Sequence, residues 1–239
     1  MRSLFLSHRG ESDDAPENTL EAFNLAIEGK SDGIELDIHL TKDGHLVVVH
    51  DDNLQRVANS NLVIAESNLQ DIKAVHPVPT LAEFLALDLS GMRVQIEIKG
   101  KTDLFPKFKE LLDQEHVKKF DITISSFDAN LLKAAKDVFP NYQRILLIDL
   151  TKLTDGNALP PVEETIKYLK QYSVTGISVK SDIRINKTYV NSLKEAGFNV
   201  VAWGVFTDDL GIAMADAGVE AMTCNHALKL RDKYLKLNS

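Results

Sequence analysis

The chain has 239 residues, 44% of them hydrophobic, and a formal net charge of −8. This length suits one large domain or two small ones, and the negative charge argues against a general affinity for nucleic acid or anionic membranes. Cys224 is the single cysteine, which excludes an internal disulfide framework and fits a reducing compartment. The N-terminal apolar run is too short for a signal peptide and no stretch approaches a membrane span, so we expect a cytoplasmic protein without stable membrane anchoring.

The chain opens with a short apolar strand, predicted over residues 4–7, that runs into the polar sequence SHRG at 7–10. A polar segment follows, and Asn18 is predicted to cap a helix that ends near residues 29–30. Glu21 has the capping-box spacing from Asn18. We therefore expect a strand, a loop carrying a histidine and an arginine, and then a helix.

The next predicted strand, residues 33–38, carries two acids at alternate positions, Glu35 and Asp37. Residues two apart on a strand point to the same face, so the two carboxylates lie side by side. Burying adjacent carboxylates without a partner is costly, and a hard divalent cation, which prefers oxygen ligands, would relieve that cost. The alternative is a strand with one solvated polar face, which is the commoner arrangement for an isolated pair of acids.

A short turn at 41–44 separates the acidic strand from a valine-rich strand predicted over 45–49. A parallel crossover needs about a dozen residues, so these two strands must form a hairpin. The Asp-Gly pair at 43–44 is typical of such a turn. Folding the hairpin about this turn brings His50 to about the level of Glu35. A histidine beside paired carboxylates indicates chemistry rather than packing.

Residues 53–79 carry little strand signal and one short predicted helix, 69–75, and this pattern is typical of an insertion lying over one end of the main fold. Thr80 then caps a further predicted helix, with Glu83 at the capping-box position.

Strand and helix signals alternate regularly along the chain. Strands with an intervening helix number eight, at 4–7, 33–38, 93–98, 121–125, 143–148, 175–179, 198–203 and 219–223. The later helices are predicted at 104–115, 128–137, 162–172, 187–196, 208–217 and 226–237. This pattern predicts an α/β fold, a (β/α)8 TIM barrel that forms one domain over 1–239, with a hairpin and short insertion at 45–79. A doubly wound open sheet is less favoured because the chain lacks a glycine-rich nucleotide fingerprint.

The active site of such a barrel lies at the C-terminal ends of its strands. The polar and aromatic residues expected at that rim are His8, Arg9, Glu35, Asp37, His50, Glu97, Lys99, Ser125, Ser126, Phe127, Trp203 and Thr223. Among them, the carboxylates of Glu35, Asp37 and Glu97 suit Ca²⁺ or Mg²⁺ with open water positions.

The other charged residues at this rim indicate the substrate. Arg9 and Lys99 are cations beside the metal, which implies an anionic substrate, and the arginine fork suits phosphate oxygens. His8 and His50 titrate near neutrality, as an acid–base pair across a scissile ester requires. Metal, cations and two histidines together predict cleavage of a phosphoester.

Several short motifs occur together in this chain. They are HRG at 8–10, PENT at 16–19, ELD at 35–37, VVVHD at 47–51, PTLAEFL at 79–85 and EIK at 97–99. Together they resemble the glycerophosphodiester phosphodiesterases, within the phospholipase C-like phosphodiesterase superfamily. The resemblance covers nearly the whole chain and is densest over residues 5–100.

The resemblance implies a metal-dependent hydrolase that converts glycerophosphodiesters, such as glycerophosphocholine or glycerophosphoethanolamine, to glycerol 3-phosphate and an alcohol. On the family pattern, His8 and His50 are the general acid and base. The other implied contacts are Glu35, Asp37 and Glu97 to one divalent cation, Mg²⁺ or Ca²⁺, Arg9 and Lys99 to the phosphate, and Phe127 and Trp203 to the glycerol carbons. The sequence leaves open which histidine is the acid. It also leaves open whether water attacks directly or the substrate's own 2-hydroxyl attacks first, through a cyclic phosphate.

The C-terminal third departs from the family pattern at two places. WGVF at 203–206 stands where the family commonly reads WTVN, and Thr223-Cys224 stands where a Thr-Asp pair commonly closes the eighth strand. These changes affect the expected fit of the glycerol end or the leaving alcohol, and so the preferred substrate. Cys224 is expected to be a small buried residue rather than a nucleophile.

The sequence is also compatible with two alternative functions, which are less favoured. A related phospholipase-type barrel would act on lipid phosphodiesters, but the sequence offers no apolar anchor or basic patch for a membrane surface. A non-catalytic barrel would bind phosphodiesters or a partner protein, but such a domain is expected to have lost some of its acids or histidines. We therefore expect a small-molecule glycerophosphodiester as the partner, and no nucleic acid.

Overall fold

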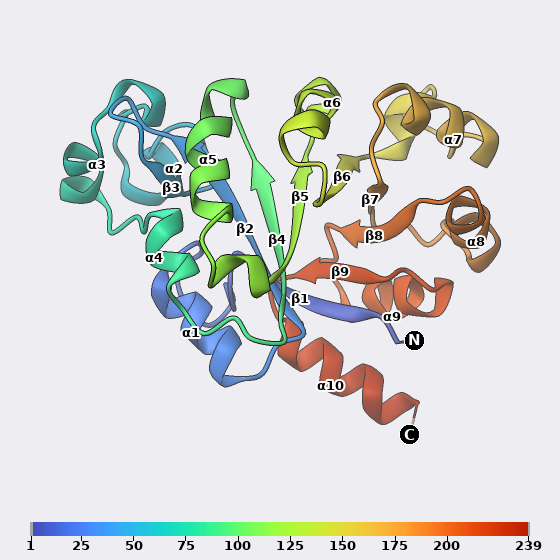
Figure 1. The fold of residues 1–239 in the computed structure, drawn as a ribbon. Helices are drawn as coiled ribbons and strands as arrows, with labels where there is room; N and C mark the ends of the chain where they lie inside the picture. The colour runs from blue at the N-terminus through green and yellow to red at the C-terminus, as the bar shows by residue number, and fades with distance from the viewer. Residues whose placement is uncertain (1, 239) are drawn as a thin grey trace.

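The computed structural model describes residues 2–238, and these form a closed barrel of parallel strands surrounded by helices (Figure 1). The strands are β1 (Leu4–His8), β2 (Gly33–Leu40), β3 (Leu46–Val48), β4 (Arg93–Ile98), β5 (Asp121–Ser126), β6 (Gln143–Ile148), β7 (Gly176–Lys180), β8 (Asn199–Trp203) and β9 (Ala221–Cys224). Their order is β1-β9-β8-β7-β6-β5-β4-β2-β3, and β1 also pairs with β2. That pairing closes the sheet, so the TIM-barrel prediction is confirmed and the open doubly wound sheet is wrong. β3 is the added strand, antiparallel to β2.

Helices follow the barrel strands in the predicted alternation. They are α1 (Leu20–Glu28), α2 (Gln55–Ala58), α3 (Leu69–Val75), α4 (Leu81–Leu85), α5 (Phe105–Leu112), α6 (Ala129–Val138), α7 (Val162–Gln171), α8 (Lys187–Glu195), α9 (Asp208–Ala217) and α10 (Ala227–Leu237). The predicted strands 93–98 and 143–148 and helices 69–75 and 208–217 match at both ends, and the others differ by a few residues. Proline in the first turn of α5 suits a helix start, because its missing N–H has no partner there in any case.

The cap of the first helix differs from the prediction. Thr19, rather than Asn18, is the N-cap residue of α1, and its hydroxyl accepts a hydrogen bond from the backbone N–H of Ala22. Asn18 has a positive φ of 56°, a conformation that asparagine tolerates better than most residues. Its side-chain amide donates instead to Asp37 Oδ2, at 3.0 Å. The predicted cap residue therefore supports the acidic strand.

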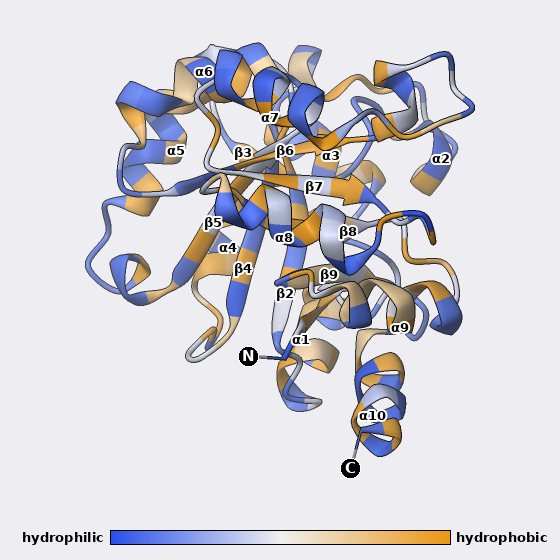
Figure 2. Ribbon diagram, turned by 90° about the vertical axis from the view of Figure 1, so that its right-hand side faces the viewer, coloured by the Kyte–Doolittle hydropathy of each residue, from blue (hydrophilic) through white to orange (hydrophobic). Residues whose placement is uncertain are grey.

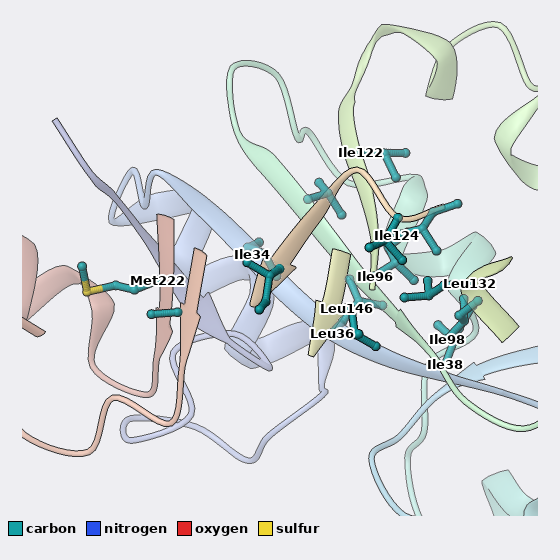
Figure 3. Close-up of a cluster of buried hydrophobic side chains, with 14 of the residues drawn as sticks. Ile34, Leu36, Ile38, Ile96, Ile98, Ile122, Ile124, Leu132, Leu146 and Met222 are labelled. Atoms are coloured by element: carbon teal, nitrogen blue, oxygen red, sulfur yellow. The ribbon is translucent and has the colours of Figure 1, made fainter. Parts of the chain in front are cut away.

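The main hydrophobic core lies between the barrel and its helices. On β2, Ile34, Leu36 and Ile38 are fully buried in this core, together with Ile96 and Ile98 of β4 (Figure 3). Each such side chain stabilises the fold by roughly 1.5–3 kcal/mol. Because strand side chains alternate, the residues between them point into the barrel. Figure 2 shows the same division, with hydrophobic colour along β7 and much hydrophilic colour on α6 and α7.

The barrel interior has an apolar floor. A separate small cluster there contains Leu6, Ile145, Val201 and Ala221. Polar side chains lie at both ends of this interior: Asn199 Nδ2 donates to Gln143 Oε1 at 2.5 Å where β8 and β6 begin, and the predicted site lies at the opposite, C-terminal ends of the strands.

The insertion after β3 has a small core of its own. Its buried residues are Val47, Val49, Leu54, Ile64, Ile72 and Val78. Leu46 and Val48 of the same hairpin strand belong to the main core instead. β3 is thus covered on both faces, which explains its continuous valine run. No helix among residues 2–238 is long and apolar enough to cross a lipid bilayer.

Candidate active site

Three buried carboxylates form the centre of the site. Glu35 and Asp37 lie on β2, and Glu97 lies on β4, where its Cα is the register partner of Asp37. One oxygen from each carboxylate can be chosen so that all three lie within 4.8 Å of one another. The alternation of β2 and the parallel pairing with β4 therefore bring together the acids that the sequence singled out.

Two cations lie against these acids. Lys99 Nζ is 2.9 Å from Glu97 Oε1 and 3.1 Å from Asp37 Oδ1. Arg9 Nε is 3.2 Å from Asp37 Oδ2, and the Arg9 backbone N–H is 3.3 Å from Glu35 Oε2. Arg9 has a positive φ of 58°, so the loop after β1 turns sharply to direct this residue toward the acids.

Lys99 and Arg9 affect the pKa values of the three carboxyl groups unequally. Burial alone would raise the pKa of Asp37, but Lys99 and Arg9 outweigh it and hold that pKa at about 2. Burial, and then repulsion from Asp37, raise the pKa of Glu97 to about 7. Burial, followed by repulsion from Asp37 and Glu97, also raises the pKa of Glu35 well above its usual range. The site thus holds more negative charge than its own side chains neutralise.

This donor set fits a divalent cation. All three groups are carboxylates, which are the ligands that Mg²⁺ and Ca²⁺ prefer, and all three are buried. Additional positive charge would offset the burial and the mutual repulsion that raise the pKa values of Glu35 and Glu97.

His8 is the last residue of β1 and faces these acids. Its Nδ1 lies 2.7 Å from the side-chain oxygen of Asn225, so Nδ1 donates and Nε2 is left free. That Nε2 is 3.9 Å from Glu35 Oε2. Burial, followed by the nearby Arg9 charge, lowers the pKa of His8 below its usual value.

His50 reaches the same site from the hairpin. The register of β2 and β3 pairs Ile38 with Val48, so His50 comes within one residue of the predicted level of Glu35. Its Nδ1 donates to Asp51 Oδ1 at 2.6 Å, since a carboxylate can only accept. His39 Nε2 donates to the backbone carbonyl of His50 at 3.1 Å. Both histidines therefore present Nε2 as the unoccupied ring nitrogen.

An ion-pair chain joins the two halves of the site. Arg56, on α2 of the insertion, donates from Nε to Asp51 Oδ2 at 2.7 Å. Its other two nitrogens donate to the Glu17 carboxylate at 2.6 and 2.9 Å. Glu17 in turn accepts from Arg9 Nη1 at 2.9 Å. One insertion residue thus connects the partner of His50 with the partner of Arg9.

These residues surround a cavity of about 340 Å³. One side is lined by ionisable side chains, those of His8, Arg9, Glu35, His50 and Glu97. The other side is apolar, and its residues are Phe127, Leu147, Trp203, Val205 and Phe206. The rings of Phe127 and Trp203 meet edge to face, with their centroids 5.1 Å apart. A polar head beside an apolar wall suits a phosphate ester of a small alcohol.

All nine residues singled out for the site lie at this mouth. Seven line the cavity directly, whereas Asp37 contacts the lining residue Arg9 and Lys99 contacts the lining residue Glu97. The sequence did not assign roles to Asn225, Asp51 and Arg56. A weak signal existed for Asn225, which lies two residues after Thr223 and so shares its side of the chain. Cys224 is buried, and burial raises the pKa of its thiol, as expected for a packing residue.

Comparison with known proteins identifies the family. The model of the glycerophosphoryl diester phosphodiesterase family matches residues 8–229. The chain belongs to this family. Enzymes of the family hydrolyse glycerophosphodiesters, so this chain is a phosphodiesterase by membership.

Similar proteins carry the same name. A glycerophosphodiester phosphodiesterase from Caldanaerobacter subterraneus is 37% identical over 164 residues, covering 62% of this chain and 67% of that protein. A putative enzyme of the same kind from Bacillus subtilis is 25% identical over 92% of this chain and 93% of its own length. The barrel also superposes on a phosphodiesterase from Oleispira antarctica with a TM-score of 0.84 at 23% identity, over all of this chain and 98% of that one. That structure was solved in complex with its product, sn-glycerol 3-phosphate.

Proposed function

We propose that this phosphodiesterase uses one divalent cation, Mg²⁺ or Ca²⁺, to convert glycerophosphodiesters such as glycerophosphocholine and glycerophosphoethanolamine to glycerol 3-phosphate and an alcohol. The observation that carries the proposal is the buried carboxylate triad Glu35, Asp37 and Glu97, in contact with Lys99 and Arg9. At one cavity, the three carboxylates can bind a metal and the two cations can bind a phosphate. The product bound by the Oleispira antarctica enzyme supports the same substrate class.

In this mechanism the triad holds the cation, which would supply positive charge to a phosphoryl oxygen. Lys99 and Arg9 bind the remaining phosphate oxygens, and the arginine fork fixes their orientation. Phe127 and Trp203 contact the glycerol carbons and exclude water from that side. Binding therefore orients the phosphorus atom between the two histidines.

His8 and His50 transfer the protons. One Nε2 takes the proton of the attacking hydroxyl, and the other returns a proton to the leaving alkoxide. Asn225 accepts the hydrogen bond from Nδ1–H of His8, and Asp51 accepts the one from Nδ1–H of His50. The reacting nitrogen of both rings is therefore Nε2. Water attack and attack by the substrate's 2-hydroxyl differ in their intermediates, because only the second passes through a cyclic phosphate, which water then opens. Phosphorus NMR of the reaction mixture distinguishes them.

The test is release of glycerol 3-phosphate from glycerophosphocholine by purified protein. We expect turnover with Mg²⁺ or Ca²⁺, its loss on adding a chelator, and its recovery on restoring the metal. Glu35→Gln and His8→Ala should each abolish most of the activity. Turnover that survives the chelator or both substitutions would refute the proposal. Absence of turnover with every head group tried would favour the non-catalytic barrel instead.

The proposal includes a cytoplasmic setting and a small-molecule partner. The single buried cysteine suits a reducing compartment, and the net charge of −8 disfavours nucleic acid as a ligand.

A further inference from the structure

His50 lies just beyond the end of a hairpin strand. β3 pairs with the last three residues of β2, 38–40, and this pairing stops at Val48. The backbone N–H of Val49 still donates to the Asp37 carbonyl, at 3.1 Å. His50 follows that bond and lies in a bend of the chain. Its backbone therefore needs a contact other than strand pairing to satisfy its polar groups and fix its position.

His39 supplies such a contact. Its Nε2 donates to the backbone carbonyl of His50 at 3.1 Å. His39 follows Asp37 by two residues on β2, so its side chain points to the same face as those of Glu35 and Asp37. The side chain is partly buried and does not line the cavity. One strand thus carries two acids of the site and the donor that holds the end of the hairpin.

The two histidines of the site approach the cavity along one edge of β2. β1 pairs with β2 over residues 33–35 and β3 pairs with it over 38–40, whereas β4 occupies the opposite edge. β1 ends at His8, and the chain that leaves β3 reaches His50. The distance between the two rings therefore depends on how firmly the hairpin is fixed to β2. The hydrogen bond from His39 fixes it at the end nearest the site.

We propose that His39 is a positioning residue, which sets the orientation of His50 by holding its backbone carbonyl. The inference rests on the proposed function, because it concerns the proton transfer assigned there to His50. Asp51 fixes the ring through Nδ1, and His39 fixes the main chain from which the ring extends. Neither residue lines the cavity. Loss of this hydrogen bond therefore impairs the proton-transfer step more than it impairs substrate binding.

A packing role for His39 predicts a different result. Packing requires the flat ring, whereas positioning requires only a donor at the end of the side chain. His39→Gln keeps an uncharged N–H donor of similar reach and removes the ring. His39→Phe keeps a flat ring and removes the donor. The two substitutions therefore separate the hydrogen bond from the packing of the ring.

The test measures kcat and KM for glycerophosphocholine, and the affinity of each variant of the full chain for the activating ion, Mg²⁺ or Ca²⁺. We expect His39→Phe to lower kcat by about tenfold or more, as is common when a residue supporting a site is lost. KM and the ion affinity from calorimetric titration should stay close to the wild-type values. His39→Gln should recover most of the wild-type kcat. His45→Phe is the control, because His45 is exposed at the turn end of the same hairpin, and it should leave all three values unchanged.

The outcomes separate this inference from the proposed function. An unchanged kcat in His39→Phe would overturn the inference and leave the proposed function standing. Equal losses in His39→Phe and His39→Gln would also overturn it, because the donor would then not be the group that matters. A fall in ion affinity that matches the fall in kcat would overturn it as well, since His39 would then act through Asp37. Absence of turnover in wild type would refute the proposed function, and the inference with it.

The folded state of each variant is checked by circular dichroism. If His39→Phe does not fold, His39→Leu takes its place, because leucine also lacks a donor. The same comparison with His39→Gln then applies, and the expected results are unchanged.

Discussion

Arg56 lies outside the cavity and connects two carboxylates that contact residues of the site. It donates to both Asp51 and Glu17, so its planar guanidinium fixes two carboxylates at once. Asp51 holds Nδ1 of His50, and Glu17 holds Arg9. Through these two acids, an insertion residue that does not line the cavity positions His50 and the proposed phosphate ligand Arg9.

We expect Arg56→Gln to lower kcat by about tenfold or more, because supporting partners of site residues commonly have effects of this size. KM should change less than kcat if His50 is the group displaced, and the pH profile of kcat should shift as His50 loses its fixed partner. Lys118→Gln is the control, because it removes an exposed cation paired only locally with Glu115. Equal kcat values and pH profiles in wild type and Arg56→Gln would exclude this positioning role.

The residues of the site differ in how far the sequence could predict them. Glu35, Asp37 and Glu97 were predictable because side-chain direction along a strand has a period of two. Arg56 was not, since Glu17 lies 39 residues away and no pattern encodes that distance. Asn18 was assigned to capping because its type suits a cap, but its left-handed backbone directs it to Asp37 instead.

The hairpin and the helix that ends the insertion act as one device for presenting His50. The backbone N–H of Val48 donates to the carbonyl of Pro79, and Val47 bridges to Thr80. Thr80 is the N-cap of α4 and forms a capping box. Its hydroxyl accepts a hydrogen bond from the backbone N–H of Glu83, and the Glu83 carboxylate accepts one from the backbone N–H of Thr80. The sequence predicted this capping box correctly, because its signal is entirely local.

The capping box should make stability depend on pH. Burial alone would raise the pKa of Glu83, but Lys73 and Thr80 outweigh it and hold that pKa at about 2, against an ordinary value of 4.5. Because the folded-state pKa is depressed, the stabilisation is complete above the ordinary pKa and is lost as pH falls toward 2.

We expect Glu83→Ala to lower the free energy of unfolding at pH 7 by about 1 kcal/mol, a modest value because Glu83 is partly exposed. The difference from wild type should shrink as the pH is lowered toward 2. Urea unfolding at a series of pH values measures it, with Glu115→Ala as an exposed control. A difference that stays constant or grows at low pH would contradict the assignment.

The barrel as a whole holds together carboxylates that repel one another. We propose that residues 1–239 form one domain, since β3 packs into both the main core and the core of the insertion. That packing offsets the repulsion among Glu35, Asp37 and Glu97 in the absence of metal. The order of the strands followed from the sequence alternation, whereas this balance depends on distances and burial that only the structure provides.

We expect Glu35→Gln to raise the melting temperature of the metal-free protein, because it removes one of the three clustered charges. Metal should raise the melting temperature of wild type and have little effect on the variant. At a metal concentration of 100 times Kd, the expected stabilisation of wild type is about 2.7 kcal/mol. Differential scanning calorimetry with and without chelator measures both effects. An equal metal-induced shift in the two proteins would place the cation elsewhere.

We propose that Glu35, Asp37 and Glu97 hold one catalytic divalent cation. The most direct measurement is calorimetric titration of the chelator-treated protein with Mg²⁺ or Ca²⁺, with glycerol 3-phosphate release followed on the same samples. We predict one ion bound per chain, activity that rises in proportion to occupancy, and loss of both in Glu97→Gln. Full turnover by protein that binds no ion, or unchanged ion binding in Glu97→Gln, would contradict the claim.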